Sequence, residues 1–131
     1  MNTQHLGFAD ITRIEPGIFE IVVAPSVEVD IHKAIAMHRF LDEHVDTPSH
    51  FLINKKNDYS LSLEAMRNVG NHPAVAGIAF LLFRPSTAKI VEIQRKLMIN
   101  REIDTGTFWD RNEALDWIRM MRGTTLQSLH A

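Results

Sequence analysis

Residues 54–62 form the segment of this sequence whose residue types and spacing are best suited to chemistry. The segment reads Asn-Lys-Lys-Asn-Asp-Tyr-Ser-Leu-Ser and follows a short apolar run. Lysine amines and the free N–H groups of a helix N-terminus bind anions, and the same setting stabilises a phosphate on serine. Alternatively, Ser60 or Ser62 caps the following helix and the lysines face solvent. The candidates for binding or phosphorylation in this segment are Asn54, Lys55, Asp58, Ser60 and Ser62.

A second polar loop, at residues 84–87, follows the longest apolar run of the chain. Arg84 comes just after this run and could pair bidentately with a carboxylate or a phosphate. Ser86 could contribute to the same site, but the more usual role of Ser86 or Thr87 is to cap the next helix. We therefore add Arg84 and Ser86 to the binding candidates and expect capping to be the main role of this loop.

The remaining chemistry-bearing residues form no catalytic or metal-binding pattern. The histidines His32, His38, His44 and His50 are six residues apart, so on a helix successive members rotate by about 240° and cannot converge on one metal ion. The chain has no cysteine, which excludes thiolate zinc sites and cysteine nucleophiles. Glycine-rich nucleotide loops and the Gly-x-Ser-x-Gly elbow are also missing. We expect a protein that is not an enzyme and has no metal or other cofactor.

Gln94 is an amide on the apolar side of a predicted helix, between Ile90, Leu97 and Met98. A buried amide needs hydrogen-bond partners. Gln94 is therefore expected to bond into a loop, to line a cavity or to lie at a subunit contact. The sequence leaves these three alternatives open.

Composition and charge indicate one globular domain. The 131 residues suit a single domain over residues 1–131, with residues 1–6 and 124–131 expected to be flexible ends. The net charge of −2 gives no electrostatic footprint for nucleic acid. No apolar run approaches the roughly 20 residues that span a bilayer, and the N-terminus shows no secretory signal. We expect a cytoplasmic protein with no nucleic-acid binding and no integral membrane association.

Periodicity and turn residues predict the elements that position the candidates. Gly17 follows a proline and fits a type II turn between two strands. Asp30 and Asp110 suit helix N-caps, and Gly70 and Gly123 are expected to end helices. The predicted strands cover residues 8–14, 18–23, 51–53, 75–83 and 102–108, and the predicted helices begin near residues 30, 62, 87 and 110. This ββαβαβαβα order predicts an α/β fold, a mixed β-sheet with helices packed on it.

Four segments carry a resemblance to a known family. They are Ile-Phe-Glu-Ile at 18–21, Phe-Leu-Ile-Asn at 51–54, Gly-Ile-Ala-Phe at 77–80, and the closing Phe-Trp-Asp-Arg-Asn-Glu-Ala-Leu-Asp-Trp-Ile at 108–118. Together with the order of elements, they resemble STAS domains, the fold of bacterial anti-sigma-factor antagonists. The chain is more closely similar to the SpoIIAA-like family, which is linked to the lipid-binding Sec14-type fold. The resemblance spans almost the whole chain and implies a STAS-type domain.

The resemblance also implies two candidate functions. STAS regulators carry an Asp-Ser-Ser-Gly-type motif with a phosphorylated serine, and residues 54–62 lack that motif, which argues against a phosphorylation switch. We expect a non-catalytic bacterial regulatory domain that binds another protein through residues 54–62 and the start of the next helix. The alternative is a domain that binds a lipid or another small apolar ligand in a cavity between the sheet and the third helix, near Gln94. A homodimer is compatible with both functions.

Overall fold

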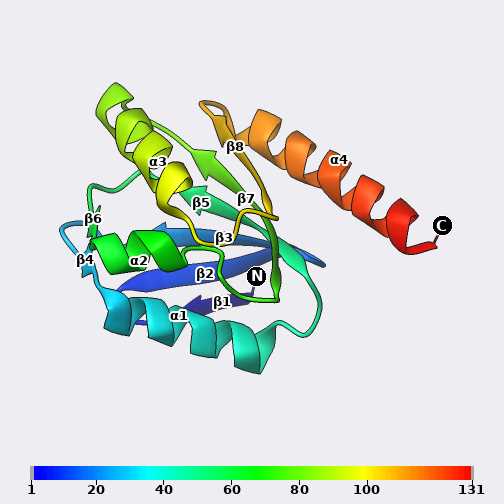
Figure 1. The fold of residues 1–131 in the computed structure, drawn as a ribbon, viewed down its shortest axis with the longest axis horizontal. Coiled ribbons are helices and arrows are strands. Elements are labelled where there is room, and N and C mark those ends of the chain that lie inside the picture. The colour runs from blue at the N-terminus through cyan, green and yellow to red at the C-terminus, as the bar shows by residue number, and fades with distance from the viewer. Residues whose placement is uncertain (1, 131) are drawn as a thin grey trace.

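A six-stranded mixed sheet forms the centre of the structure, a computed structural model that describes residues 2–130 and the side chains of residues 2–123 (Figure 1). The strand order is β1-β2-β3-β5-β7-β8, antiparallel from β1 to β3 and parallel from β3 to β8. β7 is buried along nearly its whole length, as expected for a strand inside a parallel sheet. The strands are β1 (Asn2–His5), β2 (Ala9–Glu15), β3 (Ile18–Val23), β5 (Ser49–Asn54), β7 (Val75–Leu81) and β8 (Asp104–Phe108).

Helices cover the two faces of this sheet unequally (Figure 1). One face packs against three helices through a core that includes Phe40, Ala65 and Val91. The other face packs against one helix through a second core that includes Leu115 and Ile118. The helices are α1 (Ile31–His44), α2 (Leu63–Asn68) and α3 (Pro85–Leu97) on the first face and α4 (Arg111–His130) on the second. The prediction of an α/β fold with helices packed on a mixed sheet is confirmed.

A second, two-stranded sheet holds the loop between β5 and α2, and the sequence pattern does not predict it. β4 (Glu28–Val29) pairs in parallel with β6 (Ser60–Leu61). Next to this pair, the Ser26 N–H donates to the Asp58 carbonyl oxygen at 2.7 Å. Two-residue strands are too short to give a periodicity signal. The small sheet fixes the path of residues 54–62 beside the segment that precedes α1.

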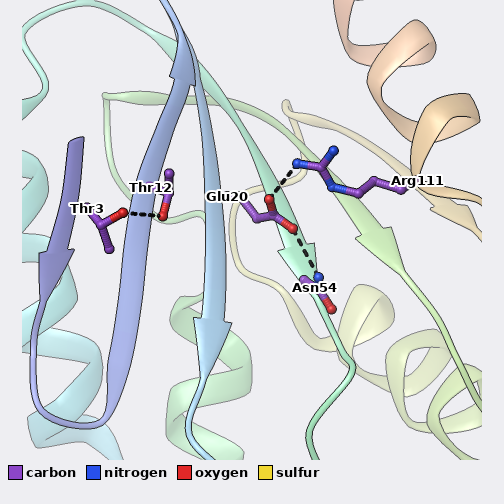
Figure 2. Close-up of polar contacts among 5 residues, drawn as sticks. All are labelled: Thr3, Thr12, Glu20, Asn54 and Arg111. Atoms are coloured by element: carbon purple, nitrogen blue, oxygen red, sulfur yellow. Dashed lines mark hydrogen bonds and ion pairs between the residues drawn. The ribbon is translucent and has the colours of Figure 1, made fainter. Parts of the chain in front are cut away.

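The N-terminal segment is more regular than predicted. Residues 2–5 form the edge strand β1 rather than a flexible end, and they pair with β2. The hydroxyl groups of Thr3 and Thr12 lie 2.9 Å apart across this pair (Figure 2). All four residues of β1 are polar, so the apolar periodicity that marks the other strands is missing there.

The C-terminal helix is longer than predicted. α4 does not end at Gly123 but continues to His130. A glycine inside a helix costs about 1 kcal/mol relative to alanine, and the other residues of a long helix can offset that cost. The flexible end proposed for residues 124–131 stays a prediction, because the side chains of residues 124–130 and all of Ala131 lie outside the described part of the chain.

His50 is a buried histidine of β5 with no hydrogen-bond partner on either ring nitrogen. It is 1% exposed. Gly77 on the neighbouring strand makes room for the ring, because a Cβ at that position would lie 2.6 Å from His50 Cδ2. Burial, and then the nearby Arg122, lower the pKa of His50 to about 4, against the opposing effect of Asp104. The ring is therefore neutral at pH 7, and its unpartnered nitrogens destabilise the core.

We predict that His50→Leu stabilises the protein and removes part of its acid sensitivity. The folded pKa of His50 lies below the unfolded value of about 6.5, so stability is lost as the pH falls from 6.5 toward 4. This loss amounts to up to about 3 kcal/mol of unfolding free energy in the wild type. Urea unfolding at several pH values across this range measures it. The control is His32→Leu, at an exposed position of α1; if both variants keep the wild-type pH profile, the assignment is wrong.

Candidate functional site

The carboxyl ends of β5 and β7 bring the two predicted loops together. Asp58 Oδ1 lies 4.0 Å from an Arg84 guanidinium nitrogen, and the Asp58 side chain is 97% exposed. An exposed ion pair of this length contributes little to stability. The two loops therefore meet, but their charged side chains remain available to solvent.

Two of the predicted site residues have structural roles, and a third is exposed. Asn54 donates to Glu20 Oε2 at 3.0 Å, and its own Oδ1 accepts the Lys56 N–H at 3.0 Å. Ser62 is the N-cap of α2, where its hydroxyl oxygen accepts the Ala65 N–H at 3.1 Å. Ser60 is exposed on β6. The capping alternative is thus the one that the structure shows for Ser62.

The predicted cap of α3 is wrong. Arg84 is the N-cap residue and makes no side-chain cap hydrogen bond. Pro85 occupies the first turn, where its fixed φ suits a helix and its missing N–H leaves no donor to satisfy. Ser86 is exposed inside that first turn, two residues after the N-cap position, so it cannot cap the helix.

Lys55 does not face solvent, contrary to the expectation for the lysines of this segment. Its side chain is 4% exposed, whereas Lys56 is exposed. The Lys55 ammonium lies over the ring of Tyr59, 4.5 Å from the centroid, and 6.0 Å from the centroid of Phe80. Burial lowers the pKa of Lys55 to about 8 and raises the pKa of Tyr59 well above its usual value.

A polar network that the sequence does not reveal joins β3, β5 and α4 (Figure 2). The Glu20 carboxylate accepts from Asn54 and, at 2.7 Å, from an Arg111 guanidinium nitrogen. Burial raises the pKa of Glu20, but the hydrogen bonds from Arg111 and Asn54 outweigh burial and lower it overall. The three residues are 34 and 91 positions apart in sequence, so no local pattern could have linked them.

An apolar cavity of about 110 Å³ lies between the sheet and helices α1 and α2. Gln94 reaches it from α3, is 1% exposed, and has no hydrogen-bond partner at Oε1. Of the three alternatives for Gln94, the structure shows that it lines a cavity, whose helical side comes mainly from α1 and α2 rather than from α3. The lining includes Ile21, Val23, Met37, Leu41, Phe51, Ile53, Tyr59, Ala65, Val69 and Ile78.

Two histidines lie at the α1 side of this cavity. His38 lines the cavity, and its ring centroid lies 5.4 Å from that of His72. His72 accepts the Ala74 N–H through Nδ1, so its Nε2 carries the proton and donates to Asp42 at 2.7 Å. Burial, and then His72, lower the pKa of His38. His38 is therefore neutral at pH 7 and compatible with an apolar ligand.

The four histidines of the six-residue series do not gather at one place. Among the described side chains, those of residues 2–123, no group of three or more His, Asp or Glu residues is placed to hold a metal ion. No helix in the same part of the chain is long and apolar enough to cross a membrane.

Comparison with known proteins identifies the fold. An uncharacterised protein of the DUF3478 family from Shewanella loihica PV-4, which has a SpoIIAA-like fold, is similar to this chain with a TM-score of 0.56. The match has 16% sequence identity and covers 84% of this chain and 91% of that one. The sequence itself matches no protein-family model and no curated protein. The predicted SpoIIAA-like fold is therefore confirmed, and at this identity the likeness carries no information on activity.

We predict that Arg111→Gln destabilises the protein by about 1 kcal/mol at pH 7, because the half-buried Glu20 loses its charged partner. The pKa of Glu20 is lower in the folded state than in the unfolded state. The network therefore stabilises the folded protein at pH values above the unfolded carboxyl pKa. This stabilisation is lost as the pH falls through the folded pKa of Glu20. The difference between variant and wild type should therefore shrink at pH 3.

The matched control is Lys96→Gln, which breaks the exposed pair between Lys96 and Glu92 on α3. An exposed pair one helical turn apart contributes only a few tenths of a kcal/mol. Urea unfolding of both variants at pH 7 and pH 3 makes the comparison. Equal effects of the two substitutions at pH 7 would show that the Glu20 network is not stabilising.

Proposed function

We propose that this protein binds a small apolar ligand, without converting it, in the cavity under α1 and α2. The observation that carries this proposal is the cavity itself, an apolar space whose wall contains the buried amide of Gln94. Ligand sites in proteins are mostly apolar and hold a few polar groups that fix the orientation of the ligand. The cavity has this character.

The volume of the cavity limits the size of the ligand. Apolar cavities of about 150 Å³ bind benzene or xenon. A space of about 110 Å³ thus suits a single ring or a short branched chain. A complete lipid chain would need the helices α1 and α2 to move apart.

Gln94 adds a chemical requirement. Its Oε1 atom is buried and accepts no hydrogen bond in the structure. A buried acceptor without a donor costs about 1–3 kcal/mol. A ligand that places a hydroxyl or N–H group against this oxygen gains that energy back, so the proposed ligand is apolar with one hydrogen-bond donor.

We predict that phenol binds at least about fivefold more tightly than benzene, which corresponds to about 1 kcal/mol for the hydrogen bond to Gln94. The methyl group of Met37, which lines the cavity, reports binding through its chemical shift in ¹³C NMR titrations. Gln94→Leu should remove the preference for phenol while leaving benzene binding in place.

One variant that fills the cavity and one control variant test whether the cavity is the ligand-binding site. Ala65→Leu places a larger side chain in the cavity and should abolish binding of both probes. Ala36→Leu makes the same substitution on α1, at a position outside the lining, and should bind like the wild type. Equal binding by the two variants, or no shift at Met37 in the wild type, would refute the proposal.

A second candidate function is that of a regulatory or protein-interaction domain. Two large apolar side chains at the carboxyl edge of the sheet favour it. Phe83 and Trp109 are 50% and 58% exposed, and they follow the paired strand ends Leu81 and Phe108. Exposed aromatic side chains are enriched at protein interfaces. The occupant that we propose for this edge is a second copy of the chain.

The oligomeric state tests this second candidate. Sedimentation velocity should show a dimer for the wild type and a monomer for the double variant with Phe83→Ser and Trp109→Ser. Ile35→Ser removes an exposed apolar side chain from α1 and serves as the control. A monomeric wild type, or a dimer that survives the double substitution, would overturn it.

A further inference from the structure

Lys55 is a buried amine with no acidic partner among the residues that the structure describes. Its backbone N–H donates to the Leu81 carbonyl oxygen at 3.0 Å, which extends the parallel pairing of β5 and β7 by one residue and fixes the backbone. The side chain is 4% exposed, and the contacts of its ammonium group are with the rings of Tyr59 and Phe80. Lysine is almost never buried to this degree without a paired charge.

The charged groups nearby are committed elsewhere. Glu20, the buried carboxylate of this part of the sheet, is bonded to Asn54 and Arg111. Asp58, three residues along from Lys55, is exposed and directed toward Arg84. No carboxylate of the described residues therefore stabilises the charged form of Lys55. The aromatic rings stabilise an ammonium group only in part.

We propose that Lys55 is a covalent binding site for a small uncharged aldehyde, which its amine captures as an imine. Buried lysines in apolar surroundings supply the nucleophilic amines of Schiff-base chemistry. The site lies at the carboxyl edge of the parallel strands β5 and β7, where ligands bind in open α/β sheets. This inference does not depend on ligand binding in the cavity.

The reaction is balanced without any further reagent. The nitrogen lone pair of the neutral amine attacks the carbonyl carbon, and a proton moves from nitrogen to the carbonyl oxygen to give a carbinolamine. Loss of that hydroxyl group with the second nitrogen proton releases one water molecule and forms the C=N bond. Hydrolysis by water reverses the reaction, and no electrons pass to or from another molecule.

The walls of the site favour an uncharged aldehyde over an anion. An anion would need several donors, and the described contacts of the Lys55 amine are aromatic rings only. Lys56 is exposed, and its backbone N–H is already bonded to Asn54 Oδ1. A small aldehyde has an apolar chain for the rings and needs only the amine.

The protonation state of Lys55 supports this chemistry. Burial lowers the pKa of Lys55 to about 8. At pH 7 about 9% of such an amine is neutral, compared with about 0.04% of a lysine with the ordinary pKa of about 10.4, a ratio of roughly 200. Part of this advantage is offset, because a less basic amine is a weaker nucleophile and the site is enclosed.

The test is the rate at which each lysine of the wild-type protein reacts with propionaldehyde at pH 7. Sodium cyanoborohydride traps the imine as a stable secondary amine, and peptide mass mapping locates it. We expect Lys55 to be alkylated at least about tenfold faster than Lys56, its exposed neighbour. The ratio should fall as the pH rises toward 10, where both amines are largely neutral. A Lys55 rate equal to or below that of Lys56 at pH 7 would overturn the proposal.

A pair of variants and one competing ligand complete the test. Lys55→Met should remove the fast phase of alkylation, and Lys56→Met should keep it; circular dichroism establishes that each variant is folded. Inorganic phosphate probes the anion alternative by NMR of the lysine ¹³Cε resonances. If phosphate shifts the Lys55 resonance and the aldehyde reacts no faster there than at Lys56, Lys55 is an anion site and the proposal fails.

Discussion

The strands β5 and β7 are covered by helices on both faces, and this coverage decides what every polar residue near them can do. A parallel sheet needs helices on both sides, since its crossover connections place them there. A polar group inside such a layer must find a partner, remain neutral or destabilise the fold. Glu20 and Asn54 find partners in each other and in Arg111. His50 and the Gln94 Oε1 atom have no hydrogen-bond partner, and Lys55 contacts aromatic rings but no described carboxylate.

These three groups differ in what surrounds them, and their surroundings decide whether each one is a candidate for binding another molecule. His50 is enclosed by the α4 layer and the neighbouring Gly77, so that nothing but protein reaches it. Gln94 lies on the wall of a space that is already open. Lys55 lies at the end of its strand, where the sheet stops and loops begin. We therefore base the two binding proposals on Gln94, which lines the cavity, and on Lys55, which lies at the edge of the sheet.

The sequence predicts those features that depend on local pattern. The order of elements, the caps at Asp30 and Ser62, the turn at Gly17 and the burial of Gln94 all follow from residues within a few positions of one another. The burial of Lys55 does not, because Tyr59 and Phe80 come to enclose it only when β5, β7 and the following loop are assembled. The β4–β6 pair and the Glu20 network likewise depend on contacts between distant segments.

Tyr59 links the cavity and the buried amine. Its ring lines the cavity and lies beneath the Lys55 ammonium group, so the two proposed sites have one side chain in common. A ligand bound in the cavity, as proposed, would pack against this ring and restrict its movement. An aldehyde that approaches Lys55 needs the ring to yield, because the amine is almost fully covered. If both proposals hold, occupation of the cavity should oppose imine formation, and linkage then requires the imine to weaken ligand binding by the same factor.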